Sequence, residues 1–396
     1  IKYWDIGQGS YLTDGKAGMS SGKSVTERLF SFFARANYSY QDKYMLSASI
    51  RHEGSSKFAA DNRWANFWSA TAGWRISNEE FMKDFDWLDD LKIRFGYGVT
   101  GNNDFSATYM ANMLGSDTNW MMPNGTWAYS YGKSQNVNPN LGWEEKKEWN
   151  LGVDYSFFEG RLYGKFDYYR REVDNLLFSV KVPQPPYTQG SQMQNIGSME
   201  SKGWEFEVGG DIIRTKDFTW SSSMNLSHNT GKILTLEGDN SYHNGNGFVA
   251  PGTPGDAARM EAGSTIGSFY MWKFAGFDDE GSFLLYNKDG EVIPAAQKTE
   301  NDKQYIGNYT PKLIIGWSHT LTYKNFDLGI NLRSWIDFDV YNTINMYYGI
   351  QGQGNLNVLK DAYGKFNHIK GEKQICDYFL EDGTFLKIDA ITLGYT

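Results

Sequence analysis

The sequence predicts an all-β fold, a transmembrane antiparallel β-barrel, from three observations. Apolar and polar residues alternate with period two in runs of about ten residues, the length of a strand that crosses a bilayer. Aromatic residues make up 16% of the chain and gather near the ends of these runs. Short turns alternate along the chain with long loops rich in Gly and Asn, as they do in membrane barrels.

The first two strands are predicted on either side of residues 41–42, a link short enough for a tight hairpin. One face of each strand is apolar and the other is polar. We expect lipid to contact Phe30, Phe32, Leu46, Trp68, Trp74, Ile93 and Tyr97, and we expect Arg35, Arg51, Arg75 and Arg94 to face the lumen.

The same alternation recurs along the chain and defines the later strands. The runs are 68–76, 91–99, 151–157, 162–168, 204–212, 218–226, 313–323 and 326–332. The final run, 385–395, alternates less cleanly, which indicates a bulge. Only residues 78–90 suggest a helix, and a short one.

Strand length and surface pattern favour a membrane barrel over a soluble β-sandwich. Sandwich strands usually have about five to six residues, fewer than these runs. Mid-strand charges such as Arg35 and Glu207 fit both architectures, because a sandwich also exposes a polar face to water. The opposite face is broadly apolar and bordered by Trp and Tyr, as lipid-facing bands are. The soluble sandwich remains the alternative.

Strand direction limits what residues 230–311 can contain. One predicted strand ends near Asn229 and another starts near Lys312, both on the long-loop side of the barrel. An even number of wall strands therefore lies between them. One pair is available, but 267–276 is apolar on both faces and 282–287 is too short to cross. We therefore expect no wall strand here, and an extracellular hairpin packed under neighbouring loops or a partner protein.

Composition and motifs argue against nucleic acid and against catalysis. A net charge of −9 leaves no basic stripe for phosphates. Carboxylates that are neighbours in the chain, such as Asp89 and Asp90 or Glu144 and Glu145, cannot flank one bond as a glycosidase requires. The five His residues lack metal-ligand spacing, and residues 278–281 fit a hairpin turn better than a calcium loop. We expect no catalytic residue, cofactor or metal, and Cys376 is interpreted as a free thiol.

The long loops carry aromatic residues that lie outside the strand pattern, among Gly and Asn. Their rings suit stacking on sugars or peptide side chains, contact with a partner protein, or packing of the loops against each other. The sequence leaves these roles open. The candidates for substrate or partner contact are Trp120, Trp127, Tyr129, Tyr131, Tyr187, Tyr242, Phe248, Tyr347 and Tyr348.

Six segments, in order within residues 26–396, resemble the SusC/RagA family of TonB-dependent outer-membrane transporters of Bacteroidetes. They are RLFSFFARANYSYQDKYMLSASIR, NRWANFWSATAGWRIS, WLDDLKIRFGYGVTGNN, LGWEEKKEWNLGVDYSFFEGRL, YIGNYTPKLIIGWSHTLTYKNFDL and EDGTFLKIDAITLGYT.

The resemblance implies import of a nutrient oligomer, either glycan or peptide, across the outer membrane of a Gram-negative bacterium. It implies a barrel of about 22 strands around a plug, coupling of the plug to TonB, and a SusD-like surface lipoprotein as a lid. Pairs of transporter and lipoprotein could form dimers. We expect residues 1–396 to be part of one barrel domain, with the plug, the first strands and the closing strands outside this chain.

Two other functions fit the strand pattern without the resemblance. A passive porin-like channel has a similar wall but no plug. A surface glycan-binding β-protein without transport would stay soluble without detergent.

Overall fold

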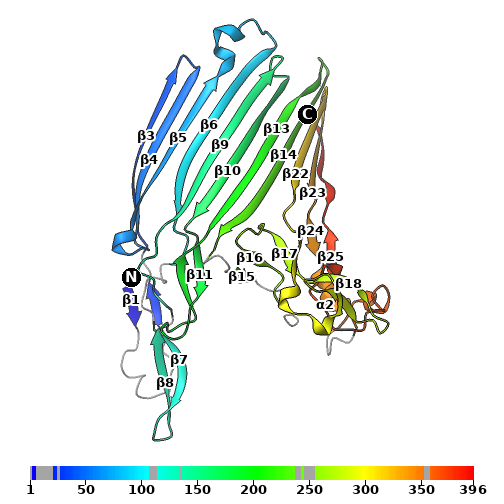
Figure 1. Ribbon diagram of the computed structural model, residues 1–396. Helices are drawn as coiled ribbons and strands as arrows, with labels where there is room; N and C mark the ends of the chain where they lie inside the picture. The colour runs from blue at the N-terminus through cyan, green and yellow to red at the C-terminus, as the bar shows by residue number, and fades with distance from the viewer. Residues whose placement is uncertain are drawn as a thin grey trace. The chain divides into compact units, whose positions relative to one another are not determined.

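The computed structural model describes residues 2–5, 21–24, 27–106, 114–133, 135–236, 242–244, 255–351 and 357–396. Its main feature is an 11-stranded sheet in the order β26-β23-β22-β14-β13-β10-β9-β6-β5-β4-β3 (Figure 1). Neighbours in the sheet are also successive long strands in the chain, and the order ends at β3 and β26, so the sheet is open. The strands are β3 (Leu29–Tyr40), β4 (Tyr44–Ser55), β5 (Trp64–Arg75), β6 (Leu88–Asn102), β9 (Glu144–Phe157), β10 (Leu162–Asp174), β13 (Ser198–Arg214), β14 (Phe218–Thr235), β22 (Leu313–Tyr323), β23 (Phe326–Ile336) and β26 (Phe385–Tyr395).

The wall strands have 11 to 18 residues. This length confirms the sequence prediction, since a strand that crosses a bilayer at a tilt needs about nine to eleven residues. No helix of the described residues is long and apolar enough to span a membrane.

The register of β3, β4 and β5 confirms the predicted apolar face. Tyr38 lies opposite Leu46, and Ile50 lies opposite Trp68. Because side chains alternate along a strand, these residues and Phe30 share one face. They are exposed: 57% for Phe30, 53% for Leu46 and 53% for Ile50. A contiguous apolar surface of this kind is stable only against lipid or another apolar partner.

The other face of the same three strands is polar and internally hydrogen-bonded. Ser47 Oγ donates to Asn37 Oδ1 at 2.8 Å, and Arg35 Nε donates to Ser47 Oγ at 3.3 Å. On the next strand pair, the hydroxyls of Ser49 and Ser69 lie 2.7 Å apart. These bonds run across the strands, as polar pairs on a hydrated sheet face do.

Two aromatic residues depart from the simple alternation. Phe33 stands on the polar face, opposite Arg51, and is 80% exposed. His52 stands on the apolar face, where its ring stacks on Trp64 at 4.7 Å. The stacking gives the imidazole an apolar partner in place of water.

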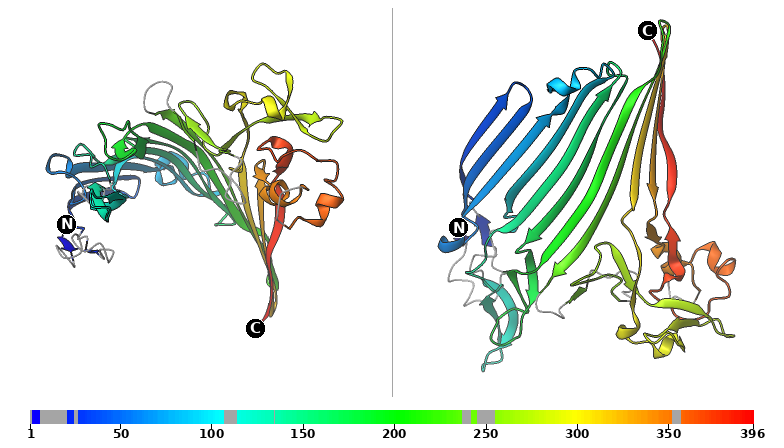
Figure 2. Two further views of the ribbon diagram at one scale, coloured as in Figure 1. Left: turned by 90° about the horizontal axis from the view of Figure 1, so that it is seen from below. Right: turned by 45° about the horizontal axis from the view of Figure 1, so that its top comes forward.

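The final strand contains the predicted bulge. Ala390 pairs with Asn331 and Ile388 pairs with Leu332, so Asp389 is the extra residue between them. Figure 2 shows this red strand running beside the orange β23. The carboxylate of Asp389 lies 3.3 Å from the guanidinium of Arg333, which lies on the polar face.

β14 extends to Thr235 and pairs directly with β22, so the described residues between them add no strand to the wall, as predicted. The segment 267–287 instead contributes to small sheets outside the wall. β17 (Ser268–Met271) pairs with β21 (Gln304–Asn308), and β18 (Lys273–Phe277), β19 (Phe283–Tyr286) and β20 (Val292–Pro294) form a three-stranded sheet. β18 and β19 make the predicted hairpin.

The remaining elements are short. Residues 78–90 form no α-helix; the 3₁₀ turns there are Ile76–Asn78 and Glu80–Met82. The other strands are β1 (Lys2–Asp5), β2 (Ser21–Ser24), β7 (Leu114–Met121), β8 (Trp127–Lys133), β11 (Leu177–Lys181), β12 (Ser191–Asn195), β15 (Tyr242–Asn244), β16 (Arg259–Glu261), β24 (Asp339–Tyr341) and β25 (Leu380–Asp382), beside helix α2 (Thr343–Tyr348). Further 3₁₀ turns are Ala60–Asn62, Ala295–Gln297, Glu300–Asp302, Lys360–Tyr363 and Asp377–Phe379.

Introducing a charge on each face of the wall should have unequal effects. Ile50→Arg puts a cation against lipid at mid-strand, which costs about 2–4 kcal/mol near the bilayer midplane. Ser69→Arg at the same height puts the cation on the polar face, where water solvates it. We expect Ile50→Arg to lower the amount of folded full-length protein in outer-membrane fractions, measured by heat-modifiable gel mobility. Equal yields of the two variants would contradict the face assignment.

Candidate functional site

The polar face of the wall carries cation–carboxylate pairs between neighbouring strands. Lys165 Nζ of β10 lies 3.1 Å from the carboxylate of Glu207 in β13, and Lys92 Nζ of β6 lies 3.7 Å from that of Asp154 in β9. The side chains keep a quarter to a half of their surface exposed. Exposed pairs add little stability. Their main effect is to keep this face polar and hydrated, while the opposite charges in each pair cancel.

The first long-loop assembly is held by three asparagine side chains, which we call the asparagine clamp: Asn136, Asn138 and Asn195. Asn136 Nδ2 donates to the carbonyls of Gln189 (2.7 Å) and Ser191 (2.9 Å). Asn138 Nδ2 donates to a carbonyl in β12 at 3.0 Å. Asn195 closes the clamp, since its amide both accepts from the N–H of residue 142 (2.7 Å) and donates to the carbonyl of that residue (2.9 Å).

A small hydrophobic core lies in the same assembly. Leu141 is fully buried and packs with Phe58, Phe105 and Trp143. The indole of Trp143 donates to the carbonyl of Arg63 at 3.2 Å, so its polar atom is satisfied. The clamp and this core together fix the segment 136–143 against 188–195.

The second long-loop assembly has a larger core, built from residues 255–309 and 338–380. Met271, Leu285, Met346 and Cys376 are each 0% exposed, and the apolar segment 269–272 is buried throughout. In Figures 1 and 2 the yellow and orange segments lie together accordingly. The predicted packing of the 267–287 hairpin under neighbouring loops is therefore confirmed.

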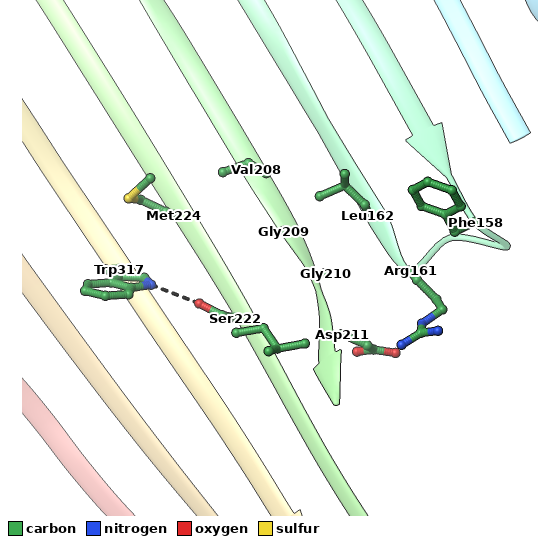
Figure 3. A pocket seen from close by; sticks show the side chains of 11 residues that line it. Phe158, Arg161, Leu162, Val208, Gly209, Gly210, Asp211, Ser222, Met224 and Trp317 are labelled. Atoms are coloured by element: carbon green, nitrogen blue, oxygen red, sulfur yellow. Dashed lines mark hydrogen bonds between the residues drawn. The ribbon is translucent and has the colours of Figure 1, made fainter. Parts of the chain in front are cut away.

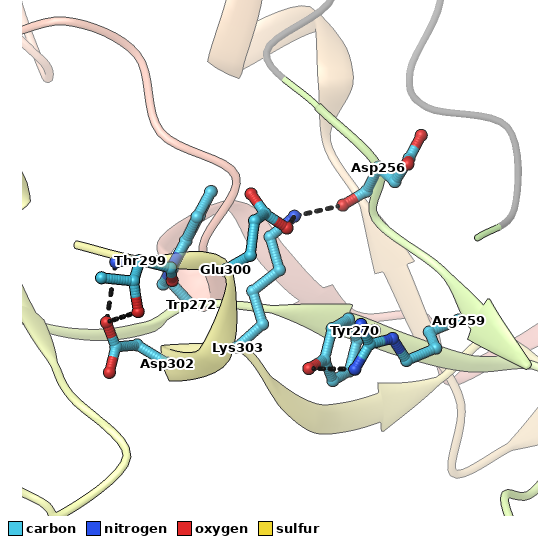
Figure 4. Close-up of polar contacts among 8 residues, drawn as sticks. All are labelled: Asp256, Arg259, Tyr270, Trp272, Thr299, Glu300, Asp302 and Lys303. Atoms are coloured by element: carbon cyan, nitrogen blue, oxygen red, sulfur yellow. Dashed lines mark hydrogen bonds and ion pairs between the residues drawn. The ribbon is translucent and has the colours of Figure 1, made fainter. Parts of the chain in front are cut away.

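Lys303 supports this core from inside (Figure 4). Its side chain is only 1% exposed, and its ammonium donates to the carbonyl of Asp256 at 2.9 Å and pairs with the Glu300 carboxylate at 2.8 Å. The same ammonium lies 4.4 Å from the centre of the Trp272 ring. The Trp272 indole donates to the carbonyl of Thr299 at 2.8 Å. A buried cation with a carboxylate, a carbonyl and an aromatic face around it has its charge compensated.

A capping box begins the 3₁₀ turn beside Lys303. The carboxylate of Asp302 accepts from the N–H and hydroxyl of Thr299, both at 2.7 Å, and from the N–H of Lys288 at 3.0 Å. Burial alone would raise the pKa of Asp302, but these hydrogen bonds outweigh it and hold the pKa below its ordinary value. The ionised carboxylate thus connects three points of the loop.

A family model described as "TonB dependent receptor-like, beta-barrel" matches residues 3–342, most of the wall and of its loops. The chain belongs to the TonB-dependent receptor family. The TonB-dependent receptor SusC of Bacteroides thetaiotaomicron is 32% identical over 97% of the chain, and receptor P3 of Formosa agariphila is 30% identical over 93%. The RagAB peptide transporter structure matches 97% of the chain with a TM-score of 0.76 at 25% identity.

These matches assign the chain to the SusC/RagA-like outer-membrane receptors, which confirms the predicted resemblance, fold class and membrane. The chain spans 39% of SusC, 38% of P3 and 44% of the RagAB chain. SusC and P3 are named TonB-dependent receptors, and RagAB is named a peptide transporter. The soluble sandwich alternative is wrong, because these receptors are membrane barrels.

The predicted loop aromatics lie in different places in this TonB-dependent receptor. The hairpin β7–β8 contains Trp120, Trp127, Tyr129 and Tyr131, with Trp120 opposite residue 128. Tyr242 lies in β15, opposite Glu261. Phe248 lies outside the described residues.

Three tyrosine candidates have described side chains. Tyr187 is half-buried, next to Thr188, whose N–H and hydroxyl donate to the clamp residue Asn136. Tyr348 is half-buried at the end of α2. Tyr347 is 2% exposed inside the second core, so its ring packs the loops and offers no surface to a ligand.

The predicted turn at residues 278–281 and the predicted free thiol of Cys376 agree with the structure. The Asp278 carboxylate accepts from the N–H groups of Glu280 (3.0 Å) and Ser282 (2.7 Å), which forms a hairpin turn. Burial raises the pKa of the Cys376 thiol to about 12, so the thiol stays protonated and unreactive. Within the described ranges, no group of three or more His, Cys, Asp and Glu is placed to hold a metal.

The sequence reasoning missed the asparagine clamp and the buried Lys303. The Asn residues around Pro139 were a usable signal, because Asn side chains commonly bond to nearby backbone in loops. Nothing local marks Lys303, whose partner Trp272 lies 31 positions earlier in the sequence.

Acidification should loosen the Asp302 capping box. A carboxylate whose folded pKa is lowered stabilises the fold above its unfolded pKa, and this contribution is lost as pH falls through the folded pKa. We expect the protection of backbone amides in 288–303, relative to their intrinsic exchange rate at each pH, to fall below the ordinary aspartate titration range. In Asp302→Asn, the amides of this segment should already have low protection at neutral pH, and their protection should depend less on pH.

Asp289→Asn is the matched control, because Asp289 is exposed in the same segment. An Asp302→Asn protein with the exchange profile of the parent would contradict the role given to this carboxylate.

Proposed function

We propose that the full-length protein imports a nutrient oligomer, glycan or peptide, across the outer membrane, driven by TonB and closed by a SusD-like lipoprotein lid. The observation that carries the proposal is the match of residues 3–342 to the TonB-dependent receptor barrel. The similar RagAB is a peptide transporter, and SusC is a TonB-dependent receptor.

The structure supports import through its wall and loops. One wall face is apolar and suits lipid, whereas the other carries hydroxyls and paired charges and suits a hydrated lumen. The long loops have cores of their own, such as Leu141 and Met271, so they present firm surfaces beyond the wall. Recognition commonly lies on loops that a rigid scaffold holds.

Residues 1–396 are proposed to be part of one barrel domain that also includes a plug, first strands and closing strands. TonB would act on the plug, and substrate would be held between the long loops and the lid. Tyr187, Tyr348 and the hairpin β7–β8 are the proposed contacts for substrate or lid. Two transporter–lipoprotein pairs would form the assembly.

Uptake measurements test the energy source and the substrate class. Intact cells should accumulate a fluorescent oligosaccharide or oligopeptide, and the accumulation should fall to background when TonB is deleted or the proton gradient is collapsed. The substrate class is whichever of the two is accumulated. Uptake that persists without TonB would overturn the proposal and favour the passive porin-like channel.

Replacing the hairpin 114–133 with a flexible Gly-Ser linker should separate capture from folding. The hairpin's strands pair with each other and not with the wall, so the barrel should assemble normally. We expect normal amounts of protein in the outer membrane but reduced uptake or reduced co-purification of the lipoprotein.

Removing 342–372 provides the contrasting variant. It deletes core residues such as Met346, Ile350 and Phe366, so it should destabilise the second loop assembly, and protease resistance should fall. Normal uptake and normal lid binding without 114–133 would show that this hairpin has no part in recognition.

A further inference from the structure

A groove of about 430 Å³ lies on the apolar face of the wall, across β10, β13, β14 and β22 (Figure 3). Leu162, Val208, Met224 and Trp317 form its sides, and Gly210 forms part of its floor. Trp317 lies opposite Met224 and opposite Leu332 in the sheet register, which places the groove on the face that contacts lipid.

Missing side chains create the hollow. A Cβ at Gly210 would sit 2.2 Å from the backbone oxygen of Arg161, so close approach of β13 to this turn requires glycine. One side of the groove is held in position, because the indole of Trp317 donates to Ser222 Oγ at 2.9 Å. The groove is thus a depression in the apolar face, with Trp317 held at one side.

The groove lies at the short-turn end of the strands. Phe158 and Arg161 line it, and both belong to the tight turn between β9 and β10. The ring of Trp87 lies near Phe158 at 6.5 Å and stacks on Phe157 at 5.6 Å, so an aromatic cluster marks this level. Aromatic girdles lie at membrane interfaces, and short turns of outer-membrane barrels face the periplasm.

The rim of the groove carries one exposed cation, Arg161. The nearby carboxylate of Asp211 already has partners, since it accepts from Ser221 Oγ at 2.6 Å and lies 3.6 Å from Arg214. The guanidinium of Arg161 is therefore available to an anion at the interface. Guanidinium and phosphate form strong bidentate hydrogen bonds.

We propose that this groove binds one phospholipid of the periplasmic leaflet, with an acyl chain between Met224, Val208 and Trp317 and the headgroup phosphate on Arg161. The apolar sides match the chain, and the rim cation matches the phosphate at interface height. Lipid A also has acyl chains and phosphate, but it occupies the opposite leaflet, away from the short turns.

Native mass spectrometry of the intact, delipidated transporter tests the site with palmitoyl-oleoyl phosphatidylethanolamine as the probe. The parent protein should retain one lipid more tightly than the rest. Met224→Trp, which fills the groove, should lose that lipid, and Arg161→Gln should bind it about tenfold more weakly because a charge-assisted contact is lost.

Leu393→Trp and Lys216→Gln are the matched controls. Leu393 is exposed on the apolar face of β26, and Lys216 is exposed in the short turn after β13; neither lines the groove. Both should retain the lipid as the parent does. Equal retention by Arg161→Gln and Lys216→Gln would overturn the proposal, even if Met224→Trp failed to fold. Preferential retention of purified lipid A by the parent would overturn it as well.

Discussion

Hydrogen bonding of the backbone in a medium without water is the constraint on which the wall depends. In a bilayer each unpaired N–H or C=O costs several kcal/mol, so every strand must be bonded on both sides. An antiparallel ladder meets this need with short links, because each strand starts where the previous one ends. Because successive side chains of a strand point to opposite faces, every second residue contacts lipid and the residues between them face the lumen. The alternation from Phe30 to Trp74 follows from this requirement.

The loops obey different physics, because they leave the ladder and must find their own partners. The first assembly relies on side-chain amides, which supply the bonds that a sheet would otherwise supply to the backbone. The second assembly has its own hydrophobic core, with aromatic rings around Met271 and with the buried cation of Lys303 against Trp272. The wall therefore presents two independently stabilised structures, each firm enough to hold a binding surface.

The wall was predictable from the sequence, whereas the loop assemblies were not. Alternation is a local signal, so the faces of Leu46 and Ile50, the missing wall strands in 230–311 and the bulge near Asp389 could all be derived. His52 deviates from the pattern and stacks on Trp64, whereas nothing in the structure explains the place of Phe33, which is exposed opposite Arg51. Many loop contacts join residues far apart in the sequence, such as Lys303 with Asp256, 47 positions apart, and Trp272 with Cys376, 104 positions apart. Burial of Tyr347 belongs to this class, since its loop looks polar and open in sequence.

The extra residue in β26 acts as a phase change in the alternation. After the extra residue, odd-numbered side chains such as Ile391 and Leu393 lie on the apolar face. Before it, the even-numbered side chains of Leu386 and Ile388 lie on that face. In a strand of constant phase, Lys387 and Asp389 would both point into the hydrocarbon. One additional position thus returns a cation to the polar side, and the carboxylate at that position lies within 3.4 Å of both Lys387 and Arg333. The same amino acid corrects the phase of the strand and neutralises the charge that the correction brings in.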